Sequence, residues 1–144
     1  VNEPHMPLKA YKNMNAYKLF VLDVGLLGAM SELPAESILE GNDIFVEFKG
    51  ALTEQYVLQQ LISDTPYTPY YYGNEKATFE QDFLIQKAKS IVPIEVKAEQ
   101  NIRSHSLKTY CEKFQPEEAV RFSTLKYKEQ ERMVNIPLYA VCNL

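Results

Sequence analysis

A strict alternation of apolar and charged residues in the middle of the chain constrains its fold more than any other feature. In residues 91–98, Glu95 and Lys97 fall on one face of an expected β-strand and the apolar side chains fall on the other. Residues 77–85 alternate in the same way and assign Asp82 to one face of a second strand. The sequence therefore predicts two neighbouring strands, each with one charged face.

The segments around these strands predict a sheet flanked by helices. Apolar positions recur every 3.6 residues between Ile44 and Ile62, which predicts the longest helix. A second helix is expected to begin at Ser104 or Ser106 and to end before Pro116. The remaining segments are read as a strand or short apolar turn at 18–24, a hairpin strand at 66–72, a strand at 119–123, a charged turn at 126–132 and a last strand at 133–141. The predicted fold class is α/β, an α/β sandwich.

Length and composition limit the class of protein. A chain of 144 residues, 46% hydrophobic and 24% charged, is expected to form one packed domain. The longest apolar stretch, Leu19 to Met30, is interrupted by Asp23 and is too short to cross a bilayer, so no membrane segment is expected. Two cysteines and two histidines, without zinc-site spacing, argue against a disulfide framework or a structural zinc. This usage is typical of a reduced, cytoplasmic protein.

The polar N-terminal region predicts a connection to another module. Residues 1–16 show no hydrophobic period, contain Pro4 and Pro7, and begin without Met or a signal-peptide pattern. We expect residues 1–16 to be a linker from a missing upstream region and residues 17–144 to form the domain itself.

The overall charge argues against tight, autonomous DNA binding. The formal net charge is −4, from 15 basic and 19 acidic residues, so no global field attracts a polyanion. Basic residues are nevertheless concentrated in positions 87–132, which leaves a local basic surface open. Scattered lysines and arginines are more often a solvated face.

Glu54, Asp82, Glu95 and Lys97 are the candidate site residues. Glu54 lies at the edge of the apolar stripe of the expected long helix, where a carboxylate needs a partner, a metal ion or contact with water. Carboxylates from adjacent strands can hold Mg²⁺, and a nearby lysine can support the attack of water. The plain alternative is a sheet with one solvated face, on which Glu95 and Lys97 form an exposed salt bridge worth about 0–1 kcal/mol.

The order of these elements resembles the PD-(D/E)XK nuclease superfamily, which has the restriction-endonuclease-like fold. Within that superfamily, the chain is similar to an uncharacterised domain that lies C-terminal to the ATPase module of a bacterial and archaeal AAA+ family. The resemblance covers nearly all of the chain from Tyr17 onward. The segments that carry it are Lys18 to Leu26, Phe48 to Glu54, Glu80 to Phe83, Ile94 to Lys97 and Ile136 to Tyr139.

The resemblance implies a mixed central sheet flanked by helices, with the core order α-β-β-β-α-β. It implies Asp82 and Glu95 as metal ligands, Lys97 as the catalytic lysine and Glu54 as a further acidic residue that supports the metal. The implied cofactor is Mg²⁺ or Mn²⁺. Glu80 would be a neighbour, and Gln100 and Tyr110 could complete the site. Gln81 stands where the superfamily often has proline.

The implied function is metal-dependent phosphodiester hydrolysis of DNA by a domain tethered to an AAA+ ATPase. Expected partners are DNA and the ATPase module of the same polypeptide, through which an oligomer could form. The alternative is a catalytically inactive module of the same fold that binds DNA, a partner or the ATPase ring. No glycine-rich phosphate loop is present, so this piece is not expected to bind ATP.

Overall fold

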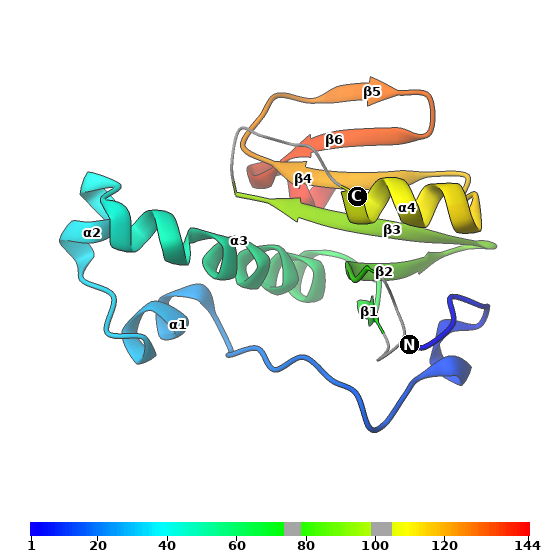
Figure 1. Cartoon of the computed structure of the whole chain (residues 1–144), viewed down its shortest axis with the longest axis horizontal. Helices are drawn as coiled ribbons and strands as arrows, with labels where there is room; N and C mark the ends of the chain where they lie inside the picture. The colour runs from blue at the N-terminus through cyan, green and yellow to red at the C-terminus, as the bar shows by residue number, and fades with distance from the viewer. Residues whose placement is uncertain (74–78, 99–104) are drawn as a thin grey trace.

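The computed structural model describes residues 1–73, 79–98 and 105–144, and its centre is one mixed sheet (Figure 1). Six strands lie in the order β1-β2-β3-β4-β6-β5. The pairs β3–β4 and β4–β6 are parallel, and the other three pairs are antiparallel. The strands are β1 (Tyr70–Tyr72), β2 (Gln81–Lys87), β3 (Ser90–Lys97), β4 (Ala119–Ser123), β5 (Lys128–Gln130) and β6 (Met133–Pro137).

Two helices cover the sheet, and the predicted α/β class is confirmed. The order α3, β1, β2, β3, α4, β4 reproduces the expected α-β-β-β-α-β core. Figure 1 shows α1 alongside α3, and α2 at the end of α3 that points away from the sheet. The helices are α1 (Val24–Met30), α2 (Ala35–Glu40), α3 (Asp43–Asp64) and α4 (His105–Phe114), with short 3-10 helices η1 (Leu8–Tyr11) and η2 (Leu138–Asn143). No described helix is long and apolar enough to cross a membrane.

The core consists of two apolar clusters, one on each face of the sheet. Val57 and Leu61 of α3 pack against β2, β3 and β4 in the first cluster. Tyr110 of α4 packs in the second. Phe83 belongs to the first cluster and its neighbour Leu84 to the second, as side-chain alternation along β2 requires. The two helices therefore lie on opposite faces of the sheet.

Residues 18–23 form no strand, which corrects one of the two expectations for this segment. The backbone N–H of Val21 donates to Gln55 Oε1 at 3.1 Å, and its carbonyl accepts from Gln55 Nε2 at 2.9 Å. Val24 N–H donates to Gln59 Oε1 at 3.1 Å. Glutamines of α3 thus satisfy backbone groups that would otherwise need a neighbouring strand.

The C-terminal third also differs from expectation in two places. Residues 128–130 pair with β6 as β5, although a charged turn was expected at 126–132. The last strand ends at Pro137, not at Val141, because the following residues form η2. This turn of helix buries Val141 in the α3 cluster, which satisfies its apolar side chain without a longer strand.

Strand β3 contains a proline, Pro93, although proline lacks the N–H that a strand interior normally uses. Pro93 pairs with Leu84 of β2, one residue before the first β3–β4 pair, Ile94 with Val120. A residue without an N–H is tolerated there because the β4 ladder has not yet begun. The strand therefore starts at Ser90.

The N-terminal region packs on the domain through Leu8. Its side chain is only 1% exposed and joins the α4-side cluster. Its backbone N–H donates to Gln86 Oε1 at 3.1 Å. The role of residues 1–16 as a linker stays a prediction, but Leu8 fixes part of that region against β2.

The packing of α3 on the sheet predicts a stability difference between two leucines. Leu61 is fully buried, whereas Leu39 of α2 is 87% exposed. We expect Leu61→Ala to lower the free energy of unfolding by about 2–5 kcal/mol, because it removes buried methyl groups and leaves a cavity. Leu39→Ala should change it by less than about 0.5 kcal/mol. Urea unfolding measures both, and equal effects would contradict this packing.

Candidate functional site

The candidate site lies where β2 and β3 run side by side. The β2–β3 pairing reaches Phe83 and Ile94, so Asp82 and Glu95 are the next residues beyond this pair, and the charge of Glu95 raises the pKa of Asp82. Lys97 follows two residues later on the same face of β3. On the other side, Glu95 pairs with Arg121 of β4. Glu95 and Lys97 are thus in direct contact, and Asp82 lies within electrostatic range of both Glu95 and Glu54.

Glu95 is buried, and each of its two carboxylate oxygens has a partner. Its side chain is 5% exposed, and Oε1 lies 2.7 Å from Lys97 Nζ. Its other oxygen, Oε2, accepts from Gln81 Nε2 at 3.0 Å. A buried carboxylate is costly unless it is paired and hydrogen-bonded, and both conditions are met here. The Glu95–Lys97 salt bridge exists, but the expectation that it lies on a solvated face is wrong.

Asp82 is the most strongly perturbed acid in the described chain. Burial and, to a lesser extent, the charges of Glu95 and Glu54 raise its pKa to about 7. The Val96 N–H, which donates to Asp82 Oδ2 at 2.8 Å, and the charge of Lys18 oppose this increase. The carboxylates of Asp82, Glu95 and Glu54 therefore lie near one another in a region with little access to water.

Glu54 is held by a lysine that the sequence did not indicate. Lys18 Nζ lies 2.8 Å from Glu54 Oε1, and the two side chains are 27% and 26% exposed. Burial acts to lower the pKa of Lys18, but the hydrogen bond and charge of Glu54, with the charges of Asp82 and Glu80, raise it overall. Lys18 stands 36 residues before Glu54, in a segment without regular structure, so no periodicity links the two.

Gln81 is a second residue whose role the sequence does not indicate, since the alternation in residues 77–85 only puts it on the face opposite Asp82, among apolar side chains. It is fully buried, and its Nε2 donates to the carbonyl of Ile94 at 2.7 Å as well as to Glu95. Its Oε1 has no hydrogen-bond partner among the described residues. The signal available in the sequence was a polar amide in an otherwise apolar strand position, since buried amides need partners.

The remaining predicted neighbours contribute differently. Tyr110 packs against Tyr72 and Phe114 in the aromatic cluster under α4, and burial raises its pKa. Glu80 acts on Lys18 through its charge. Gln100 lies outside the described residues. Arg121, which is 4% exposed, donates from Nε to Asn135 Oδ1 at 2.9 Å, and burial lowers its pKa.

The donor chemistry fits a divalent cation through two carboxylates. Within residues 1–73, 79–98 and 105–144, no group of three or more His, Cys, Asp or Glu side chains is arranged to hold a metal ion. Glu54, Asp82 and Glu95 therefore form no ready three-carboxylate cage. Asp82 and Glu95 remain as hard oxygen donors on adjacent strands, and Mg²⁺ is commonly held by one or two carboxylates with several waters retained.

The raised pKa of Asp82 predicts a pH-dependent stability. The unfolded chain releases this proton near the ordinary value of 3.8, and the folded protein releases it near 7. Between these values the unfolded state binds fewer protons, so this group lowers the stability as pH rises, by at most about 1.4 kcal/mol per pH unit. We expect Asp82→Asn to gain stability relative to wild type from pH 4 to 7 and to hold a constant difference above it. Urea unfolding across this range measures it, and a flat difference would contradict the assignment.

Comparison with known proteins assigns the chain to a family. Residues 49–141 match the family described as "Domain of unknown function (DUF4143)", and this span contains Glu54, Asp82, Glu95 and Lys97 but not Lys18. Domains of this family typically lie at the C-terminal side of AAA-type ATPases. No curated protein and no solved structure matches the chain. Because the match covers more than half of its length, the chain belongs to the DUF4143 family.

Proposed function

We propose that this domain hydrolyses phosphodiester bonds of DNA with one Mg²⁺ or Mn²⁺ held by Asp82 and Glu95. The observation that carries the proposal is a buried Glu95, 5% exposed and bound to Lys97 at 2.7 Å, whose charge also acts on Asp82 of the adjacent strand. An ordinary one-sided sheet has no need to bury such a group, because apolar residues of similar size are often at least as stabilising.

Each residue of this cluster has a distinct role in the proposal. The ion, when bound, would lower the pKa of a coordinated water and polarise the phosphoryl group. Lys97 is 30% exposed and bonded to Glu95, so its ammonium can reach a phosphate and stabilise the negative charge that develops there. Gln81 fixes the orientation of Glu95 through its 3.0 Å hydrogen bond. Lys18 holds Glu54 and reduces the negative charge beside Asp82.

An attached ATPase module would supply the attraction to DNA that this domain lacks by itself. A net charge of −4 gives no general attraction to DNA. We therefore infer that the DNA is delivered by an ATPase module of the same polypeptide, as the typical arrangement of the family favours. In this arrangement the domain needs only local contacts around the strand that it cleaves.

Calorimetric titration with Mn²⁺ tests the metal site. We expect binding to wild type and a loss of at least about tenfold in Asp82→Asn, since one of two anionic ligands becomes neutral. Asp64→Asn, an exposed site at the end of α3, is the matched control and should bind as wild type does. Lys97→Met should retain Mn²⁺ but lose cleavage of single- and double-stranded DNA. Absence of Mn²⁺ binding to wild type would contradict the proposal.

A non-hydrolytic interaction module is the second candidate, and a different surface favours it. Residues 19–46 expose a run of large apolar side chains, among them Leu19 at 86%, Leu22 at 84% and Leu39 at 87%. Large apolar side chains exposed in such number along one stretch of a chain favour a contact with another protein. In this proposal the region of α1 and α2 docks on the ATPase module, and the buried charges of the sheet serve only to define the fold.

ATP turnover in a polypeptide that carries the ATPase module separates the two candidates. We expect Leu22→Glu and Leu39→Glu each to alter the ATPase rate by several-fold, because a charge at the centre of an apolar contact weakens it. Gln130→Glu, on the exposed strand β5, is the control and should leave the rate unchanged. An unchanged rate in all three variants would exclude the docking role.

A further inference from the structure

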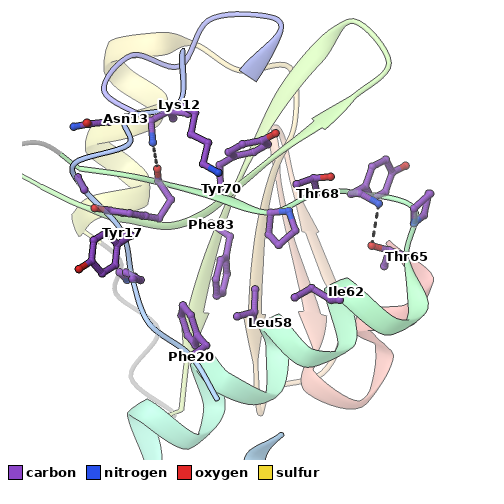
Figure 2. Close-up of a pocket in the computed structure, with 17 residues that line it drawn as sticks. Lys12, Asn13, Tyr17, Phe20, Leu58, Ile62, Thr65, Thr68, Tyr70 and Phe83 are labelled. Atoms are coloured by element: carbon purple, nitrogen blue, oxygen red, sulfur yellow. Dashed lines mark hydrogen bonds between the residues drawn. The ribbon is translucent and has the colours of Figure 1, made fainter. Parts of the chain in front are cut away.

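A cavity of about 580 Å³ lies beside the candidate site, between the N-terminal segment, the C-terminal part of α3 and β1. Figure 2 shows Phe20, Leu58 and Phe83 pointing toward one another at its base, with Tyr17 on one side and Thr68 on the other. The ring centroids of Phe20 and Phe83 are 6.0 Å apart. The volume is in the usual range for a small-molecule site, which is about 300–1,000 Å³.

The lining of this cavity combines aromatic rings with positive charge. Tyr17, Tyr67, Tyr70 and Tyr71 supply aromatic walls above the Phe20–Phe83 base. Lys12 and Lys18 also line the cavity, and none of its described lining residues is acidic. Lys18 is paired with Glu54, but Lys12 adds a further positive charge to a lining without carboxylates, and this favours an anionic ligand with a flat, apolar part.

Lys18 connects the cavity with the carboxylates. Its Nζ lies 5.7 Å from the centroid of the Tyr71 ring, inside the cavity wall, and 2.8 Å from Glu54 Oε1. It is also close enough to Asp82 for each charge to change the pKa of the other. A ligand that fills the cavity would therefore hold its anionic end next to the site proposed for hydrolysis.

We propose that this cavity binds an unpaired nucleobase of a nucleic-acid strand, with the attached phosphate near Lys12 and Lys18. Bases stack on aromatic side chains irrespective of sequence, and lysines hold the backbone phosphates. The assignment of the strand as a substrate rests on the function proposed above. Base binding itself needs no metal ion and no hydrolysis. A base within a duplex is stacked and paired, so the cavity selects single-stranded or frayed ends.

The test measures binding of a short fluorescein-labelled oligothymidylate to the 144-residue chain by anisotropy, in EDTA so that no metal site contributes. Tyr17→Ala removes a ring that is 71% exposed, and Ile62→Glu adds a negative charge at a lining position that is 63% exposed. Both positions are exposed, so folding should be unaffected. The expected result is roughly tenfold weaker binding in each variant.

Matched substitutions outside the cavity control for general effects. Tyr139→Ala and Ile44→Glu change residues that are 82% and 56% exposed and do not line this cavity. Both should bind the oligothymidylate as wild type does. An abasic strand of the same length should bind at least about tenfold more weakly, because it offers phosphates without bases. Duplex DNA should also bind more weakly than the single strand.

The outcomes separate this proposal from the hydrolytic one. Asp82→Asn should keep its affinity for oligothymidylate in EDTA even though it loses Mn²⁺. If the wild type binds the abasic strand as tightly as oligothymidylate, the cavity is not a base site, and only phosphates are recognised. If Tyr17→Ala and Ile62→Glu bind like wild type, the proposal is overturned whatever the result of Mn²⁺ titration. Oligothymidylate binding without Mn²⁺ binding would leave the base site intact and reject hydrolysis.

Discussion

The burial of one carboxylate, Glu95, is the constraint on which the rest of the site depends. It lies on a strand in the middle of the sheet, and its side chain is only 5% exposed to water. The cost of burying it falls only if nearby groups donate hydrogen bonds or carry positive charge. Lys97 and Gln81 provide the direct bonds, and Arg121 lies level with it on β4. The negative charge of Glu95 also raises the pKa of Asp82 on the adjacent strand β2.

The alternation of side chains made the central part of the fold predictable. It located β2 and β3, put Glu95 and Lys97 on one face, and left the apolar residues to pack under α3. The order of helix and strands then gave the α/β sandwich. These features repeat with a fixed period along the chain, so a single sequence contains them.

The contacts that complete the site follow no such period. Lys18 reaches Glu54 from a segment whose path is set by Gln55 of α3, and nothing local in that segment predicts its direction. Gln81 was placed on the apolar face because it alternates with Asp82, yet it bonds to Glu95 across the strands. Such partners are chosen by tertiary packing, which places distant residues together after the elements have formed.

The segment that contains Lys18 contacts both the carboxylates and the aromatic cavity. Lys18 bonds to Glu54 and also lines the cavity. Gln55 binds both backbone groups of Val21, and Phe20, one residue earlier, forms the base of the cavity. The ion pair to Glu54 and the base of the cavity therefore depend on one short segment, residues 18–21, which Gln55 holds against α3. A strand that enters the cavity and a metal ion that binds the carboxylates would consequently act on the same element.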